Sequence, residues 1–139
     1  MYSVRKLTLP LLLVAFGTAS AVRADALTPL SKENHINYSL MAAVAGDVIR
    51  KTCPSISARM FVVLGKAYAL KSYARKKGYT EAEVRAFLKD PAEKARVKGL
   101  AANYLKNRGA VPGDVASYCQ VGRAEIAKKT LVGQLLRAR

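Results

Sequence analysis

The chain has 139 residues, of which 51% are hydrophobic and 24% are charged, so its composition fits one globular domain and excludes a disordered chain. Its 24 lysines and arginines outnumber the 9 acidic residues and give a net charge of +15, so an electrostatic partner is expected to be anionic. With 1 histidine, 2 cysteines and no glycine-rich phosphate loop, the chain lacks the residues that most metal, cofactor and triad chemistries need. We therefore predict no enzyme, no cofactor and no metal site.

The segment 1–26 has the three-part order of a secretory signal peptide. Arg5 and Lys6 precede an apolar run over residues 7–16, and small, weakly polar residues follow. The run is about half of the roughly 20 residues that a membrane-spanning helix needs, and Pro10 interrupts it. The sequence therefore predicts a cleaved signal rather than an anchor, and a periplasmic or secreted protein with no transmembrane span in its mature form.

Cleavage is expected after Ala21 or after Ala26, because both follow the small-x-small rule, and the second site is favoured. The chain then divides into a signal peptide at residues 1–26 and a single helical domain at residues 27–139. Removing the signal leaves 21 bases and 8 acids, which is a net charge of +13.

Cys53 and Cys119 are the two thiols of the chain. A lone pair of cysteines in a small exported domain has one possible connectivity and an oxidising compartment in which to form it, so we predict a disulfide. A reactive thiol is the alternative, but the chain has no CxxC motif and its histidine is at position 35.

Apolar residues recur at helical spacing after residue 27, while strand signals are almost absent. A first helix is expected at about Lys32–Lys51, ending before Cys53-Pro54. A second, at about Ser57–Lys77, has the most regular apolar stripe and is predicted to be central and buried on more than one side, with Gly78 as its C-terminal cap.

Two further helix starts in the middle of the chain carry capping signals. Thr80-Glu81-Ala82-Glu83 is a capping box. Asp90 caps a helix that has Pro91 in its first position and runs to about Asn107, and Glu93 is expected to reach back to the cap.

Asp114 caps a last helix, predicted to continue as far as Leu135 and Leu136. Within it, Gly122 lies on the face of Cys119 and would let another backbone approach closely.

The predicted fold is all-α, a compact bundle of four to five helices stapled by one disulfide. It consists of an N-terminal helix and two stacked helical hairpins. A repeated spacing supports the hairpins, since Tyr73, Gly78, Val84 and Phe87 align at one constant offset with Tyr104, Gly109, Val115 and Tyr118. We interpret this similarity as a repeated arrangement of helix, glycine cap, turn and helix.

Capping explains most of the acidic residues, but Glu33, Asp47 and Glu125 have no evident structural role in the sequence. His35 and Ser39 are one helical turn apart and could touch, yet no third group is available to orient the histidine. We expect His35 to be a solvated residue near a helix start and predict no catalytic residues.

The basic residues form short clusters interleaved with tyrosines. Such clusters often serve only to keep a protein soluble, but a net charge of +13 exceeds what solubility requires. The predicted binding site lies at the end of the second helix and comprises Tyr73, Arg75, Lys76, Lys77 and Tyr79.

Four segments carry a resemblance to known proteins: Ile56-Ser57-Ala58-Arg59-Met60, Ala95-Arg96, Tyr118-Cys119, and Gly122-Arg123-Ala124-Glu125-Ile126-Ala127. Over most of residues 30–136 the chain resembles a family of small exported bacterial proteins known as a domain of unknown function. The resemblance implies a two-cysteine helical fold and transfers no active residues. A second, architectural similarity is to the small periplasmic acid-stress chaperones, which are shorter and less basic.

The leading functional hypothesis is a periplasmic, non-enzymatic helical binding protein. Its basic surface would engage an acidic protein, an anionic envelope polymer or a lipid surface. A periplasmic stress chaperone that opens at low pH is the first alternative, although eight acids and one histidine offer few groups to switch it. A nucleic-acid-binding protein is the second, if the N-terminus is not a signal.

Overall fold

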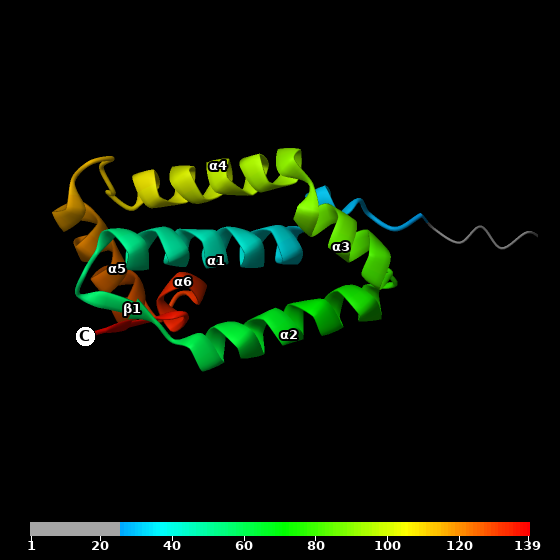
Figure 1. The fold of residues 1–139 in the computed structure, drawn as a ribbon, viewed down its shortest axis with the longest axis horizontal. Coiled ribbons are helices and arrows are strands. Elements are labelled where there is room, and N and C mark those ends of the chain that lie inside the picture. Colours follow the sequence, from blue (N-terminus) through cyan, green and yellow to red (C-terminus); the bar gives the residue numbers. More distant parts are fainter. Residues whose placement is uncertain (1–25) are drawn as a thin grey trace, which may run out of the picture.

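The computed structural model describes residues 26–139, so nearly all of the predicted signal peptide lies outside the described residues. Within them the order of elements is η1 (Leu30–Lys32), α1 (Asn34–Thr52), β1 (Ile56–Ala58), α2 (Met60–Lys77), α3 (Glu81–Lys89), α4 (Pro91–Asn107), α5 (Val115–Lys128), α6 (Leu131–Gln134) and β2 (Leu136–Ala138) (Figure 1). The all-α bundle with one disulfide is confirmed. Its helices number six in this part of the chain because the predicted last helix is broken in two.

The helix α1 forms the centre of the bundle. Figure 1 shows it between α4 and α2, with α5 and α6 near its C-terminal end. Its buried side carries mostly small or medium residues, Met41, Ala42, Ala45 and Ile49, which belong to the main hydrophobic core. It packs mainly against α4, α5 and α6. These three helices are thus arranged around α1.

The helix α5 packs closely on Ile49 of α1 and on Ile56 of β1 at Gly122. A Cβ atom at that position would lie 2.4 Å from Ile56 Cδ1 and 2.7 Å from Ile49 Cγ2. Real Cβ atoms do not come so close to a neighbour, so glycine is required at this contact. A close approach at Gly122 is thus present, but the side chains of Ile49 and Ile56 make it, rather than the backbone that the sequence led us to expect.

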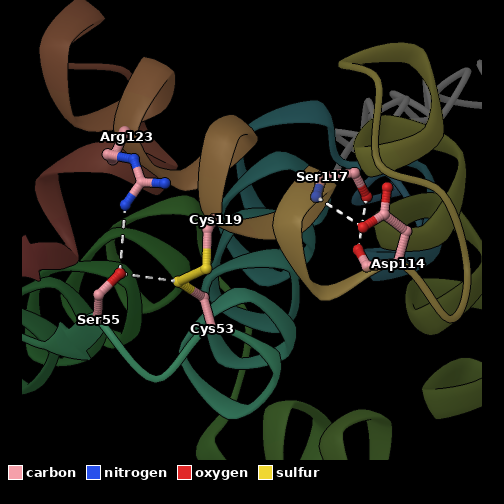
Figure 2. The surroundings of a disulfide bond; sticks show 6 residues. All are labelled: Cys53, Ser55, Asp114, Ser117, Cys119 and Arg123. Carbon is pink, nitrogen blue, oxygen red and sulfur yellow. Dashed lines mark hydrogen bonds between the residues drawn. A yellow bond between two sulfur atoms is a disulfide. The ribbon is translucent and has the colours of Figure 1, made fainter.

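The disulfide Cys53–Cys119 fastens the same contact, with the two Cα atoms 5.0 Å apart. Figure 2 shows Ser55 beside it, with its Oγ 3.2 Å from Cys53 Sγ and accepting a hydrogen bond of 3.3 Å from Arg123. The end of α1 and the middle of α5 are thus held together by a covalent bond inside a packed core.

The predicted central position of the second helix is wrong. Only Ala74 is buried among the α2 residues, all of which the structure describes. The helix α6 packs on α1 instead, and the side chains of Leu135 and Leu136 lie 3.9 Å from where a Cβ of Gly46 would be. In Figure 1, α2 runs along the edge of the molecule and α3 leads from its end toward α4.

Residues 56–58 are a strand rather than the start of a helix. Ile56 faces Ala138 and Ala58 faces Leu136 in an antiparallel pair, β1 with β2. This pairing joins a segment of the first half of the chain to the C-terminus, so no local pattern could indicate it, and α2 begins only at Met60. In the described part of the chain, strands are limited to this one sheet of two three-residue strands, so the predicted near-absence of strands is confirmed.

The capping predictions are confirmed with one exception. Gly78 and Gly109 adopt the left-handed φ angles of 104° and 100°. Thr80 and Glu83 form the expected reciprocal box at the start of α3. Asp90 accepts from two amides of α4, but Glu93 does not reach back, because its carboxylate pairs with Arg96 at 2.7 Å instead.

The last predicted helix ends early, at Lys128. Lys129 adopts a left-handed φ of 52°, and Thr130 then caps the short α6. The turn brings Gly133 against the backbone of Glu125, so close that a Cβ there would lie 1.9 Å from its carbonyl oxygen. Leu135 and Leu136 are consequently buried beyond α6 rather than along α5.

We expect replacement of both Cys53 and Cys119 by serine to lower the free energy of unfolding by about 2–5 kcal/mol, because the bridge closes a long loop of the unfolded chain. Urea denaturation measures this loss, and circular dichroism at low temperature should still show a helical protein. An unchanged urea midpoint would show that the bridge does not stabilise the fold.

Candidate functional site

The predicted binding cluster lies in and just after the last turn of α2. Arg75, Lys76 and Lys77 are exposed there. Tyr79 is buried, and its hydroxyl donates to the Thr28 carbonyl at 2.5 Å. The ring of Tyr79 is therefore not open to a partner, because it packs inside the protein.

Tyr73 is also engaged internally. Its hydroxyl donates to Glu33 Oε1 at 2.9 Å, and the Lys77 ammonium lies 5.6 Å from its ring centre. The structure thus brings the five predicted residues together but directs both tyrosines to the N-terminal segment. What remains for a partner at this place is the exposed charge of three basic residues.

A larger candidate site is an apolar hollow between α1, α2 and α3. Its volume is about 460 Å³, within the range of ligand-binding cavities. Its apolar lining residues are Leu30, Ile36, Leu40, Ala67, Leu70, Ala74, Val84, Phe87 and Leu88. Val84 and Phe87 of α3 also pack against a small core cluster that includes Ile36 and Ala74, so the hollow opens beside this cluster.

Two smaller hollows adjoin it along α1. One of about 210 Å³ lies between α1, the end of α3 and α4, and shares Leu40 with the first. Another of about 110 Å³ lies toward Leu135 and shares Ala43 with the second. We call the three together the α1 trough.

The floor of the α1 trough is one stripe of α1: Ile36, Leu40, Ala43, Asp47 and Arg50. These residues recur at intervals of three and four, so they lie on one face of the helix. The stripe is roughly 21 Å long at the rise of an α-helix. The trough is therefore an elongated surface, apolar over most of its length.

The border of the α1 trough is predominantly basic. Lys71, Arg85, Lys89, Lys94 and Lys98 line the two larger hollows, with Glu81 and Glu93 as the acids. Lys71 pairs with Glu81 at 2.5 Å and lowers the pKa of that carboxyl, and Glu93 pairs with Arg96. Within residues 26–139, Lys89, Lys94 and Lys98 have no carboxylate at ion-pair distance.

The sequence did not reveal the role of Glu125, which is 1% exposed. Its carboxylate accepts from the Tyr104 hydroxyl at 2.6 Å and from the Thr130 hydroxyl, and Arg108 lies 3.6 Å away. Burial, with the hydrogen bond to Glu125 as a second cause, raises the pKa of Tyr104 to about 12. This group joins α4, α5 and the turn before α6.

Glu33 and Asp47 also have structural partners. The Glu33 carboxylate caps α1 by accepting from the Ile36 amide at 2.9 Å, and this bond is the main cause that lowers its pKa. Asp47 pairs with Arg50 and Lys51. With Glu125, all three acids without an evident role are accounted for by internal contacts.

The other chemistry weighed from the sequence does not assemble in this part of the chain. His35 is exposed and contacts Tyr73, with the ring centres 4.4 Å apart and the ring planes tilted by 56°. No group of three possible metal ligands occurs among residues 26–139.

A family model described as a family of unknown function, DUF5333, matches residues 28–137. The chain belongs to DUF5333. The match confirms the resemblance to a family of unknown function and includes both cysteines of the two-cysteine helical domain. No curated protein and no solved structure matches the chain.

The residues matched to DUF5333 contain the whole α1 trough and all of α2. Over the residues that the structure describes, none of the helices is both long and apolar enough to cross a membrane.

Replacement of Tyr104 by phenylalanine should lower stability at pH 8, because Glu125 loses a buried hydrogen bond worth about 1.5–3 kcal/mol. A tyrosine whose folded pKa is about 12 and whose unfolded pKa is about 10 adds stability that is complete below pH 10 and is lost as the pH rises toward 12. The difference in unfolding free energy between the parent protein and the Tyr104→Phe variant should therefore narrow over that interval. Urea denaturation at several pH values measures it, and a constant difference would contradict this role of Tyr104.

Proposed function

We propose that this member of DUF5333 is an exported, non-enzymatic binding protein that holds an acidic amphipathic helix of a partner protein in the α1 trough. The observation that supports this function best is an open apolar surface bordered by surplus positive charge. The proposal refines the expectation of an acidic partner, and it moves the site from the end of α2 to the face between α1, α2 and α3.

The shape of the α1 trough favours a helix over a compact small molecule. A stripe of roughly 21 Å corresponds to about four turns, so a partner helix can lay apolar residues at i, i+3, i+4 and i+7 along it. The three hollows follow one another along α1 rather than enclosing a single chamber.

The charges at the border select the partner. Lys89, Lys94 and Lys98 stand at the meeting of α3 and α4, beside the apolar surface of Leu88. An acidic residue beside the apolar face of a bound helix could form an ion pair with one of these lysines without displacing an existing ion pair. Such rim charges contribute mainly to association rate and specificity, while the apolar contact supplies most of the affinity.

Export is supported by the disulfide, since such bonds persist in oxidising compartments. The packing of the first described residues agrees with it. Leu27 side-chain carbons would lie within 3.4–4.0 Å of a Cβ at Gly78, and Thr28 accepts from Tyr79. A chain that starts at Leu27 would thus begin at the surface of the domain, in contact with the residues that follow α2.

The trough predicts a specific pattern of crosslinking in the native envelope. A photo-reactive amino acid in place of Leu88 should link to a partner segment whose sequence is an acidic amphipathic helix, whereas the same probe in place of Asn103 should not. Asn103 is exposed on α4 and does not line the trough. Mass spectrometry of the linked peptides identifies the segment. A broad set of unrelated or unfolded proteins linked at Leu88 would contradict the proposal and favour a chaperone.

A synthetic peptide of the crosslinked segment tests the contribution of the basic residues at the border of the α1 trough. The variant Arg85→Gln/Lys89→Gln/Lys94→Gln should bind a synthetic peptide of that segment roughly tenfold more weakly at low salt, since exposed ion pairs contribute about 0.2–1 kcal/mol each. The matched control Arg75→Gln/Lys76→Gln/Lys77→Gln removes equal charge away from the trough and should keep the affinity of the parent. Equal losses in both variants would show that only net charge matters.

Intact-mass analysis tests the export proposal. We expect a protein that begins at Leu27 and has no thiol that can be alkylated without reductant, because residues 1–26 carry the signal pattern and Cys53 is bonded to Cys119. A start at Val22 would select the other cleavage site. A full-length mass, or two alkylatable thiols, would contradict export.

A further inference from the structure

The helix α2 carries a second apolar face that the α1 trough does not use. Phe61 is 91% exposed, Tyr68 is 72% exposed and Leu64 is 49% exposed. These residues are spaced by three and four, so they form one stripe along the outside of the helix. None of them lines the hollows of the trough. We call this stripe the outer face of α2.

The charge around the outer face is of one sign. From residue 48 to residue 80 the sequence has 8 lysines and arginines and no acidic residue. Arg75 continues the stripe beyond Tyr68 at the same helical spacing, and Lys66 and Lys76 are exposed on the same helix. An apolar helical face surrounded by bases is typical of helices that lie in the interface of an anionic membrane.

A hollow with two guanidinium groups lies at the start of this face. It has a volume of about 280 Å³ and is lined by Arg59, Phe61 and Arg137, together with Ala58, Met60 and Val62. Arg59 donates to the Gln134 carbonyl at 3.4 Å and Arg137 donates to Ser57 Oγ at 3.2 Å. Each arginine keeps further donors, and arginine pairs well with phosphate oxygens.

We infer that the outer face of α2 docks on an anionic phospholipid bilayer, with Phe61 and Tyr68 at headgroup level and a lipid phosphate beside Arg59 and Arg137. A second copy of the chain fits this face poorly, since two acid-free basic helices repel each other. A bilayer offers both an apolar layer for the aromatic rings and phosphates for the bases. This inference does not depend on the trough or on its partner.

The chain contains no tryptophan, so the fluorescence of one introduced tryptophan reports the surroundings of that position alone. In the exported, oxidised protein without its signal peptide, the indole emission of the Phe61→Trp variant should shift to the blue and be quenched by brominated lipid on phosphatidylcholine vesicles that contain one-third phosphatidylglycerol. Neither change should occur on pure phosphatidylcholine vesicles. The matched control is Val115→Trp, because Val115 is an exposed apolar residue on α5. Its emission should stay that of a solvated indole.

Vesicle flotation measures the affinity. The variant Phe61→Ser/Tyr68→Ser should bind the phosphatidylglycerol-containing vesicles at least tenfold more weakly, while Val111→Ser/Val115→Ser binds as the parent does. Arg59→Gln/Arg137→Gln should weaken binding severalfold more than Lys106→Gln/Lys128→Gln, which removes the same charge elsewhere. Inorganic phosphate at millimolar concentration should not release the protein, because the docking surface is the bilayer.

Three results would overturn the inference. One is the absence of flotation with phosphatidylglycerol-containing vesicles, and another is flotation of the Phe61→Trp variant with its indole still emitting as in water. The third is a blue shift of the Phe61→Trp variant without lipid, accompanied by a dimer in sedimentation equilibrium, which would assign the face to a second copy. Circular dichroism of every variant separates loss of binding from loss of fold. The Arg85→Gln/Lys89→Gln/Lys94→Gln variant should still float, so failure of the trough proposal would leave this result intact.

Discussion

The contact of α1 with α5 at Gly122 is the constraint on which the remaining architecture depends. Glycine lets Ile49 and Ile56 lie where a side chain would otherwise be, and the Cys53–Cys119 bond holds the two segments in that position. With α5 fixed, the turn at Lys129 returns the chain to α1, and Gly133 allows α6 to pack directly on the Glu125 backbone. The C-terminus can then pair with β1, so the last residues complete the core rather than extend from it.

This arrangement explains why the most regular apolar helix is not central. The helices α4, α5 and α6 all pack on α1, and α2 meets α1 only slightly. Its inward stripe borders the trough and its outer stripe is exposed. Packing within the domain does not explain why this helix has a second, exposed apolar face, since monomeric proteins seldom expose contiguous apolar surface that has no function. The two faces therefore suggest two separate contacts, one with a partner helix and one with a bilayer.

Local signals in the sequence were sufficient for most of the fold. Capping motifs at Thr80, Asp90 and Asp114 act within four residues, so they indicate helix starts reliably. How deeply a helix is buried cannot be predicted from such local motifs, because burial depends on which distant segment of the chain packs beside the helix. The stripe of α2 predicted a helix correctly but could not show that residues 131–138 would pack against α1 instead. The structural role of Glu125 could not be predicted for the same reason, because its partners Tyr104 and Thr130 come from two other segments.

The acidic residues give the clearest link between fold and proposed function. Each of the 8 carboxylates in residues 27–139 has a partner inside the protein: Glu33, Glu83, Asp90 and Asp114 cap helices, Asp47, Glu81 and Glu93 pair with bases, and Glu125 is buried with Tyr104. The fold thereby engages its negative charge internally and leaves a large surplus of bases facing outward. Because that surplus borders apolar surfaces on both sides of α2, a partner must combine negative charge with apolar groups to match it. A simple polyanion would satisfy only half of this requirement, which is why an acidic amphipathic helix and an anionic bilayer suit these surfaces better than a nucleic acid does.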